Sequence, residues 1–162
     1  MRKLAAVPLS AQSFGGIGTF VDLASKPGGF TPDHMKIEMN EPYISICRVK
    51  NPDGQWVIDT MERHISHQGR PVPEILMSDR PFVIVAGRAE DWGKWEALRA
   101  ILVPPWTLIE LAPEAPHAGL FAAKGPAAEL TNVMVILPRE TWKNNCHLAH
   151  AGEAEKFEVV LA

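Results

Sequence analysis

The chain has 162 residues, of which 46% are hydrophobic and 22% charged, a composition typical of a soluble globular protein and not of a disordered one. The length predicts one domain spanning residues 1–162, large enough to bury a substantial core. The formal net charge of −3, without any long Lys/Arg run, excludes a basic face for phosphate backbones, so we expect no nucleic-acid partner.

Short elements are expected throughout, because 14 prolines and 12 glycines are spread along the chain. Ser10 resembles a helix N-cap, and the single helical turn that it begins ends at Gly15. Residues 95–103 fit a helix or a strand, and the all-β context favours the strand. Residues 142–147 are expected to form a loop or a short edge strand. The expected strands are 4–9, 18–23, 35–39, 43–49, 56–61, 74–77, 82–87, 95–103, 108–111, 130–137 and 157–161, with another beginning at Leu120.

Two turns are expected to close β-hairpins. Residues 51–54 contain Asp-Gly, which supplies the positive φ of a hairpin turn, and they join the strand 43–49 to the strand that begins at Trp56. The turn at residues 113–116 follows the strand 108–111, and it places His117 at the mouth of a second hairpin. Residues 82–87 are almost continuously apolar, which predicts a central strand buried on both faces.

About ten short strands with almost no helix predict an all-β sandwich or barrel, whose open mouth can hold a small ligand. Cys47 and Cys146 lie far apart without CxxC spacing, which excludes a zinc knot and favours a reducing compartment. Cys146 adjoins His147, but neighbours on an extended segment point to opposite faces, so no Cys–His nucleophile is expected. The N-terminal segment is a poor signal peptide and no segment approaches membrane-spanning length, so we expect a cytoplasmic protein without membrane contact.

Two polar clusters suggest a functional site. His117, directly after its turn, is well placed to act as a ligand or proton carrier. The second cluster precedes another strand and contains His64, His67, Gln68 and Glu74. Because each cluster is expected on a hairpin of an all-β chain, the two predict one shared pocket. The alternative for each histidine is a surface or backbone-bonded side chain without chemical function.

Several segments carry a family resemblance through their order and spacing: KLAAVPLSAQSFGGIGTFVD, PYISICRVK, MERH, PFVIVAG, PHAGLF, NNCHL and FEVVLA. In these segments the chain resembles the ureidoglycolate lyase family, formerly called ureidoglycolate hydrolases. The resemblance implies the cupin double-stranded β-helix, a jelly-roll barrel with few short helices, and a homodimer. It also implies a divalent metal ion (nickel, manganese, zinc or iron) and the cleavage of ureidoglycolate to glyoxylate and urea, a reaction of purine and allantoin catabolism.

The departures from the family pattern fall at the expected site. The family's Trp-His-His stands here as Pro116-His117-Ala118, and the carboxylate of Glu74 lies where a neutral amide or an aromatic residue is usual. The spacing of His64, His67 and Glu74 also differs from the usual cupin metal pattern, in which His-x-His is followed three or four residues later by Glu. The fold inference is therefore stronger than the substrate inference, and the changes fit either a new specificity or a lost activity.

Metal ligands and catalytic residues are expected among the same side chains. His64, Glu74 and His117 would form a two-histidine, one-carboxylate set that suits a divalent transition metal with open positions for substrate. His117, His64 and Arg63 are the expected catalytic residues. Glu62 is expected to be solvated, with a salt bridge to Arg63 as the alternative.

Arg48, His67 and Gln68 are expected to bind the substrate, a small carboxylate. A guanidinium matches a carboxylate with two parallel hydrogen bonds, and Arg63 could serve in the same way. Arg48 shares one strand face with Ile44 and Ile46, so it either points into the barrel toward an anionic partner or covers the outside of an edge strand.

Two further functions compete with the lyase. A cupin sugar or sugar-acid isomerase or epimerase would use the same pocket with an acid and a base on either side of one carbon. A non-catalytic cupin that binds a small carboxylate would return its ligand unchanged, and the loss of the family's Trp-His-His favours that alternative.

Overall fold

The computed structural model describes residues 1–24, 39, 41–50, 56–66, 71–123, 130–139 and 141–161. Its strands are β1 (Arg2–Pro8), β2 (Gly18–Asp22), β3 (Pro42–Lys50), β4 (Trp56–Ile58), β5 (Thr60–His64), β6 (Glu74–Ser78), β7 (Phe82–Ala86), β8 (Arg99–Val103), β9 (Thr107–Leu111), β10 (His117–Ala122), β11 (Leu130–Pro138), β12 (Cys146–His150) and β13 (Phe157–Leu161). Its helices are α1 (Ala11–Phe14), η1 (Ala89–Asp91), η2 (Trp95–Ala97) and α2 (Thr141–Asn144). The expected strand 35–39, apart from Met39, and the expected turn 51–54 lie outside the described residues.

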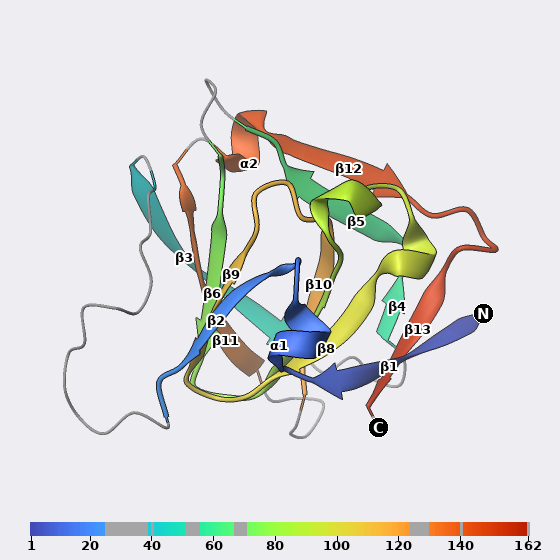
Figure 1. Cartoon of the computed structure of the whole chain (residues 1–162), viewed down its shortest axis with the longest axis horizontal. Helices are drawn as coiled ribbons and strands as arrows, with labels where there is room; N and C mark the ends of the chain where they lie inside the picture. Colours follow the sequence, from blue (N-terminus) through green and yellow to red (C-terminus); the bar gives the residue numbers. More distant parts are fainter. Residues whose placement is uncertain are drawn as a thin grey trace.

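Four antiparallel strand pairs are nested along the chain, as if one long hairpin had been rolled up (Figure 1). From the outermost to the innermost they are β3–β11, β5–β10, β6–β9 and β7–β8. The rolling distributes these strands over two sheets, in the orders β5-β10-β7-β8 and β9-β6-β11-β3. This nested pairing is the topology of a jelly roll. The expected all-β, cupin-type double-stranded β-helix with few short helices is therefore confirmed.

Further strands widen both sheets. In the first sheet β12 pairs with β5, and β1, β13 and β4 extend the other end, which makes eight strands. In this extension β1 runs parallel to both of its neighbours, β8 and β13. In the second sheet β2 pairs with β9, which makes five strands.

Both expected hairpins are wrong. Strand β9 pairs with β2 and β6, whereas β10 pairs with β5 and β7, so the turn at residues 113–116 carries the chain from one sheet to the other. Likewise β3 pairs with β11, and β4 pairs with β13 in the other sheet. The cause is the nested topology, in which each of these strands pairs with a partner distant in sequence. Local turn signals do not encode which strand that partner is.

Local signals were more accurate for individual elements. The Ser10 hydroxyl caps α1, accepting a hydrogen bond from the Ser13 backbone N–H at 3.0 Å, as expected. The expected strand 95–103 is wrong in its first part, because Trp95, 4% exposed, packs into the core from the helical turn η2 before β8 begins. Residues 142–147 are divided between α2 and β12. Among the described residues, no helix is long and apolar enough to cross a membrane.

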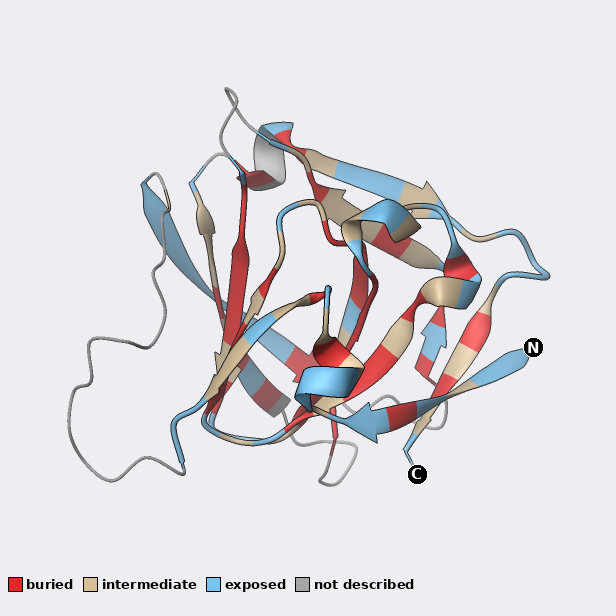
Figure 2. Ribbon diagram, viewed as in Figure 1, coloured by how far each residue is buried: buried red, intermediate tan, exposed pale blue. Residues whose placement is uncertain are grey.

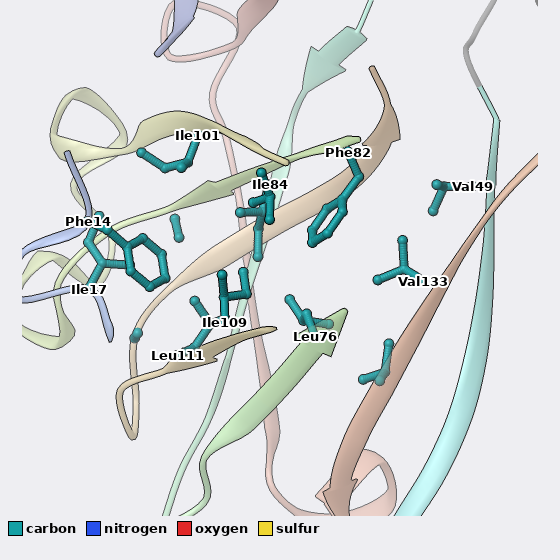
Figure 3. Packing of buried hydrophobic residues seen from close by; sticks show 14 of the residues in the cluster. Phe14, Ile17, Val49, Leu76, Phe82, Ile84, Ile101, Ile109, Leu111 and Val133 are labelled. Atoms are coloured by element: carbon teal, nitrogen blue, oxygen red, sulfur yellow. The ribbon is translucent and has the colours of Figure 1, made fainter. Parts of the chain in front are cut away.

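Strand β7 contributes to two cores, one on each face of the eight-stranded sheet. Its residues Phe82 and Ile84 point between the two sheets and pack with a cluster that includes Leu76 and Ile109 (Figure 3). Val83 and Val85 point to the other face and pack with a second cluster that contains Met61, Trp95 and Phe157. This double burial confirms the expectation for the apolar run 82–87. Figure 2 shows the contrast between buried β6 and the exposed strand β3.

Truncation of Phe82 should destabilise the protein strongly. The side chain is 0% exposed between the two sheets, so Phe82→Ala should lower the free energy of unfolding by about 3–5 kcal/mol. Urea denaturation measures this loss. The control is Leu148→Ala at a side chain that is 57% exposed, where a change within about 0.5 kcal/mol is expected. Equal losses in the two variants would contradict this account of the core.

Candidate metal centre

Strands β5, β6 and β10 bring four polar side chains together inside the barrel. Glu62 and His64 are two residues apart on β5, so they share one face of the strand. His117, the first residue of β10, pairs in register with Glu62. Glu74 is the first residue of β6 in the opposite sheet. The described members of the two polar clusters, His64 and Glu74 from one and His117 from the other, thus meet at one place.

The distances among these side chains are short. The His117 Nε2 atom lies 3.0 Å from Glu74 Oε2 and 3.4 Å from Glu62 Oε1. The His64 Nε2 atom lies 3.7 Å from the same Glu74 oxygen. The centroids of the two imidazole rings are 5.1 Å apart. Glu62, His64 and His117 can each offer one ligand atom within 4.8 Å of the others, so they could hold a metal ion.

Two buried atoms at the centre of the site lack a hydrogen-bond partner. His117 Nε2 and Glu74 Oε2 are 3.0 Å apart but are not aligned for a hydrogen bond with each other. Buried polar atoms are rarely left unpaired, and each such atom calls for an explanation. Nitrogen and oxygen ligands lie about 2.0–2.2 Å from a zinc ion, so two neighbouring ligands of one ion lie about 3 Å apart. The residues therefore fit a divalent metal ion.

The orientation of the His117 ring also suits a ligand. Its Nδ1 lies 3.0 Å from the backbone carbonyl of Ala115, to which the Nδ1–H donates. Nε2 consequently faces the carboxylates. Metal-binding histidines usually donate their other ring N–H to a carbonyl or carboxylate, which fixes the ring and its tautomer.

The charges of the site are strongly coupled. The His117 imidazole, whose Nε2 lies 3.4 Å from Glu62 Oε1, lowers the pKa of Glu62 to about 2, although burial opposes this shift. Burial disfavours the charged forms of Glu74 and His117, but their mutual attraction outweighs it, so the pKa of Glu74 is lowered and that of His117 is raised well above 6.5. Burial lowers the pKa of His64, which is only partly offset by Glu74. At neutral pH the metal-free site thus holds two carboxylates, one imidazolium and one neutral imidazole.

Cys146 supports Glu62 from the neighbouring strand β12. Its thiol donates a hydrogen bond to Glu62 Oε2 over 3.0 Å. Burial and this hydrogen bond raise the pKa of the thiol to about 12, so Cys146 is protonated and is not a nucleophile. Cys146 pairs with His64 and His147 with Arg63, and strand alternation then directs the two neighbours to opposite faces, as expected.

The other expected site residues lie elsewhere. Arg63 points to the opposite face of β5 from Glu62 and His64, with its guanidinium 4.5 Å from the ring centroid of Trp92 and 3.9 Å from Glu114. Arg48 is exposed on β3, on the face opposite buried Val49, so it takes the outer of its two alternative orientations. Their assignment to a substrate carboxylate in this pocket is therefore corrected. His67 and Gln68 lie outside the described residues.

Glu62 is partly exposed, as expected, but it also contacts both His117 and Cys146, and these contacts were not predicted from the sequence. A sequence signal did exist, because a strand places residues 62 and 64 on one face. The contribution of Cys146 had no comparable signal, because it depends on the pairing of β12 with β5.

Comparisons with known proteins do not assign the chain to a family. No protein-family model and no curated protein matches it. Among solved structures, a cobalt(II) form of HppE in complex with substrate is 20% identical, with a TM-score of 0.36, over 59% of this chain and 42% of its own. An iron(II) form of HppE is 18% identical with the same coverage and a TM-score of 0.38. Hydroxypropylphosphonic acid epoxidase from S. wedmorenis in complex with fosfomycin is 17% identical, with a TM-score of 0.37, over 59% of this chain and 41% of its own. The match thus covers less than half the length of these structures, and similarity this low carries no argument about family or activity.

Metal binding at neutral pH should release one proton. His117 is charged because its pKa is raised, so an ion bound through Nε2 must displace that proton, whereas His64 is neutral and both carboxylates are ionised. Affinity should therefore rise about tenfold per pH unit between about pH 6 and pH 8. Calorimetric titrations with Zn²⁺ in buffers of different ionisation enthalpy count the protons. Release of no proton would exclude His117 as a ligand, and release of two would show that His64 is also charged.

Proposed function

We propose that the protein is an enzyme that uses a divalent metal ion to act on a small hydroxy or ureido carboxylate. Cleavage of ureidoglycolate to glyoxylate and urea is its first candidate reaction. The observation that supports metal use is the convergence of His64, His117, Glu62 and Glu74, with unpaired buried atoms directed at one another. The choice of reaction rests on the resemblance of the sequence segments to the ureidoglycolate lyase family.

The two carboxylates differ in a way that suits different roles. The Glu74 side chain is 10% exposed and lies near both imidazoles, so with His64 and His117 it would hold the ion. A bound divalent ion supplies a Lewis acid that polarises substrate oxygens. The Glu62 side chain is 41% exposed, and solvent or substrate can therefore reach it. Glu62 would be the proton carrier of the reaction.

In ureidoglycolate cleavage the proton on the substrate hydroxyl must leave as the C–N bond breaks. Glu62 would accept this proton, and the hydroxyl oxygen would become the aldehyde oxygen of glyoxylate. The electron pair of the C–N bond goes to the departing nitrogen, to which Glu62 can return the same proton, so that neutral urea leaves. The Cys146 thiol would hold the other oxygen of Glu62 in place during both transfers.

Metal content tests the first part of this proposal. The purified wild-type protein should contain near-stoichiometric nickel, manganese, zinc or iron by mass spectrometry, and His117→Ala should lose most of it. His147→Ala is the matched control, because His147 is exposed on β12. Absence of metal from wild type after reconstitution with each ion would contradict the coordination scheme and favour a non-catalytic binding protein.

The roles of the two carboxylates can be separated by matched amide substitutions. Glu74→Gln should lower metal affinity by at least about 10–100-fold, the usual loss when only a residue that supports a ligand is changed. Glu62→Gln should retain metal and lower kcat for urea release from ureidoglycolate by about 10²–10⁴-fold, the usual contribution of a general acid–base group. Urea is measured directly. Isomerisation of a sugar acid by the metal-loaded wild type, without urea release, would instead support the isomerase alternative.

A further inference from the structure

The turn that carries His117 is held by the end of β5. Glu114 lies within this turn, and its Oε1 accepts a hydrogen bond from the Ser66 hydroxyl over 3.2 Å. Its other oxygen, Oε2, lies 3.9 Å from Arg63 Nη1. The backbone of Glu114 has φ +63°, a left-handed conformation that a glutamate adopts only when its surroundings impose it. Contacts from β5 and from Ser66, just beyond its end, thus act at the residue of the turn that has a positive φ.

Arg63 is itself fixed by contacts outside the turn. Its guanidinium lies over the Trp92 ring, 4.5 Å from the centroid, and its side chain is only 23% exposed. Trp92 directly follows η1 and packs against the core on the outer face of the eight-stranded sheet. The guanidinium is therefore held in place by the aromatic ring and can act as an anchor for Glu114.

This turn also fixes the orientation of the His117 ring. The residue after Glu114 is Ala115, whose carbonyl accepts the His117 Nδ1–H at 3.0 Å. The next carbonyl, that of Pro116, accepts a hydrogen bond from the Gly87 N–H over 2.8 Å. The Ala115 carbonyl lies one peptide group beyond Glu114. The backbone of Glu114 orients the peptide group between the two residues, whose N–H donates to the Ala112 carbonyl over 3.0 Å, and this in turn sets the starting direction of the Ala115 backbone.

We infer that Arg63 and Glu114 are positioning residues, which hold the turn before β10. The turn places the Ala115 carbonyl where it accepts the Nδ1–H of His117. The ring is thereby fixed with Nε2 toward Glu62 and Glu74. Strand β5 then contributes to the site from both of its faces. Glu62 and His64, on the inner face, are part of the site, and Arg63, on the outer face, affects the site through the turn. The effect on metal affinity rests on the proposed function, whereas the effect on the His117 ring does not. Neither residue contacts the reacting atoms in this scheme.

The alternative is an ordinary surface ion pair. An Arg–Glu contact of 3.9 Å between partly exposed side chains contributes little to global stability. The two explanations therefore differ in what the loss of the contact changes: a surface pair affects almost nothing, whereas a positioning pair affects the His117 ring and the metal.

Glu114→Gln tests the inference, because it retains the shape of the side chain and removes its charge. Glu90→Gln is the matched control, since Glu90 forms an exposed pair with Arg88 at 4.0 Å and the substitution causes the same change in net charge. Titration with Zn²⁺ should show affinity about tenfold weaker in Glu114→Gln and unchanged in Glu90→Gln, as for other groups that hold a metal ligand in place. Arg63→Lys should have a similar effect, because lysine lacks the planar fork, and the double variant should be no weaker than either single one.

A second measurement needs no metal. Nitrogen-15 NMR of the histidine side chains should show a slowly exchanging His117 Nδ1–H in metal-free wild type, and faster exchange in Glu114→Gln but not in Glu90→Gln. If wild type binds no Zn²⁺ but this difference appears, the proposed function fails and the positioning role stands. If Glu114→Gln matches wild type in both measurements, or if Glu90→Gln weakens binding equally, the inference is overturned.

Discussion

The pairing of β5 with β10 is the constraint on which the candidate site depends. It sets His117 opposite Glu62 and leaves His64 two residues farther along the same face of β5. A shift of one residue would turn Glu62 and His64 to the outer face, because side chains alternate along a strand. Met61 opposes such a shift, because it is 0% exposed in the second core on the outer face of β5 and would be moved into the polar site. The hydrophobic core therefore determines the chemistry of the pocket through strand register.

The site places ionisable groups where burial disfavours charge. Glu74 and His117 are 8% and 6% exposed, and each remains charged because the other lies within 3.0 Å, with further support from His64 for Glu74 and from Glu62 for His117. Taking charged groups out of water costs folding free energy even when they are paired, and loss of either partner would leave an unpaired buried charge. This cluster of buried charged groups therefore lowers the stability of the fold. Among the described residues, the other buried side chains between the two sheets are mostly aliphatic or aromatic, such as Phe14 and Leu111, and the polar ones, Ser78, Thr107 and Thr131, are uncharged. Such a concentration of cost at one place is typical of a functional site.

The two faces of β5 carry residues with different roles. The inner face carries Glu62 and His64, and the outer face carries Met61 in the second core and Arg63 over Trp92. Arg63 does contact a carboxylate, as its chemistry suggests, but the carboxylate is the protein's own Glu114. The Arg63 guanidinium, which the sequence predicts to bind the substrate, thus contacts the turn that precedes His117, a candidate metal ligand.

Local sequence patterns predicted most of the strands, although not β5, together with the cap at Ser10, the doubly buried run 82–87 and the residues His64, Glu74 and His117 as members of one site. These follow from local propensity and from the periodicity of apolar residues, which are properties of neighbouring positions. The pairing of the strands and the division of β9 and β10 between two sheets could be seen only in the folded chain. The same holds for the place of Glu62 in the site and for the orientation of Arg48 and Arg63 away from it. The reason is that nested pairing joins strands that are distant in sequence. This pairing also sets which face of each strand points into the barrel, and the neighbouring turns do not.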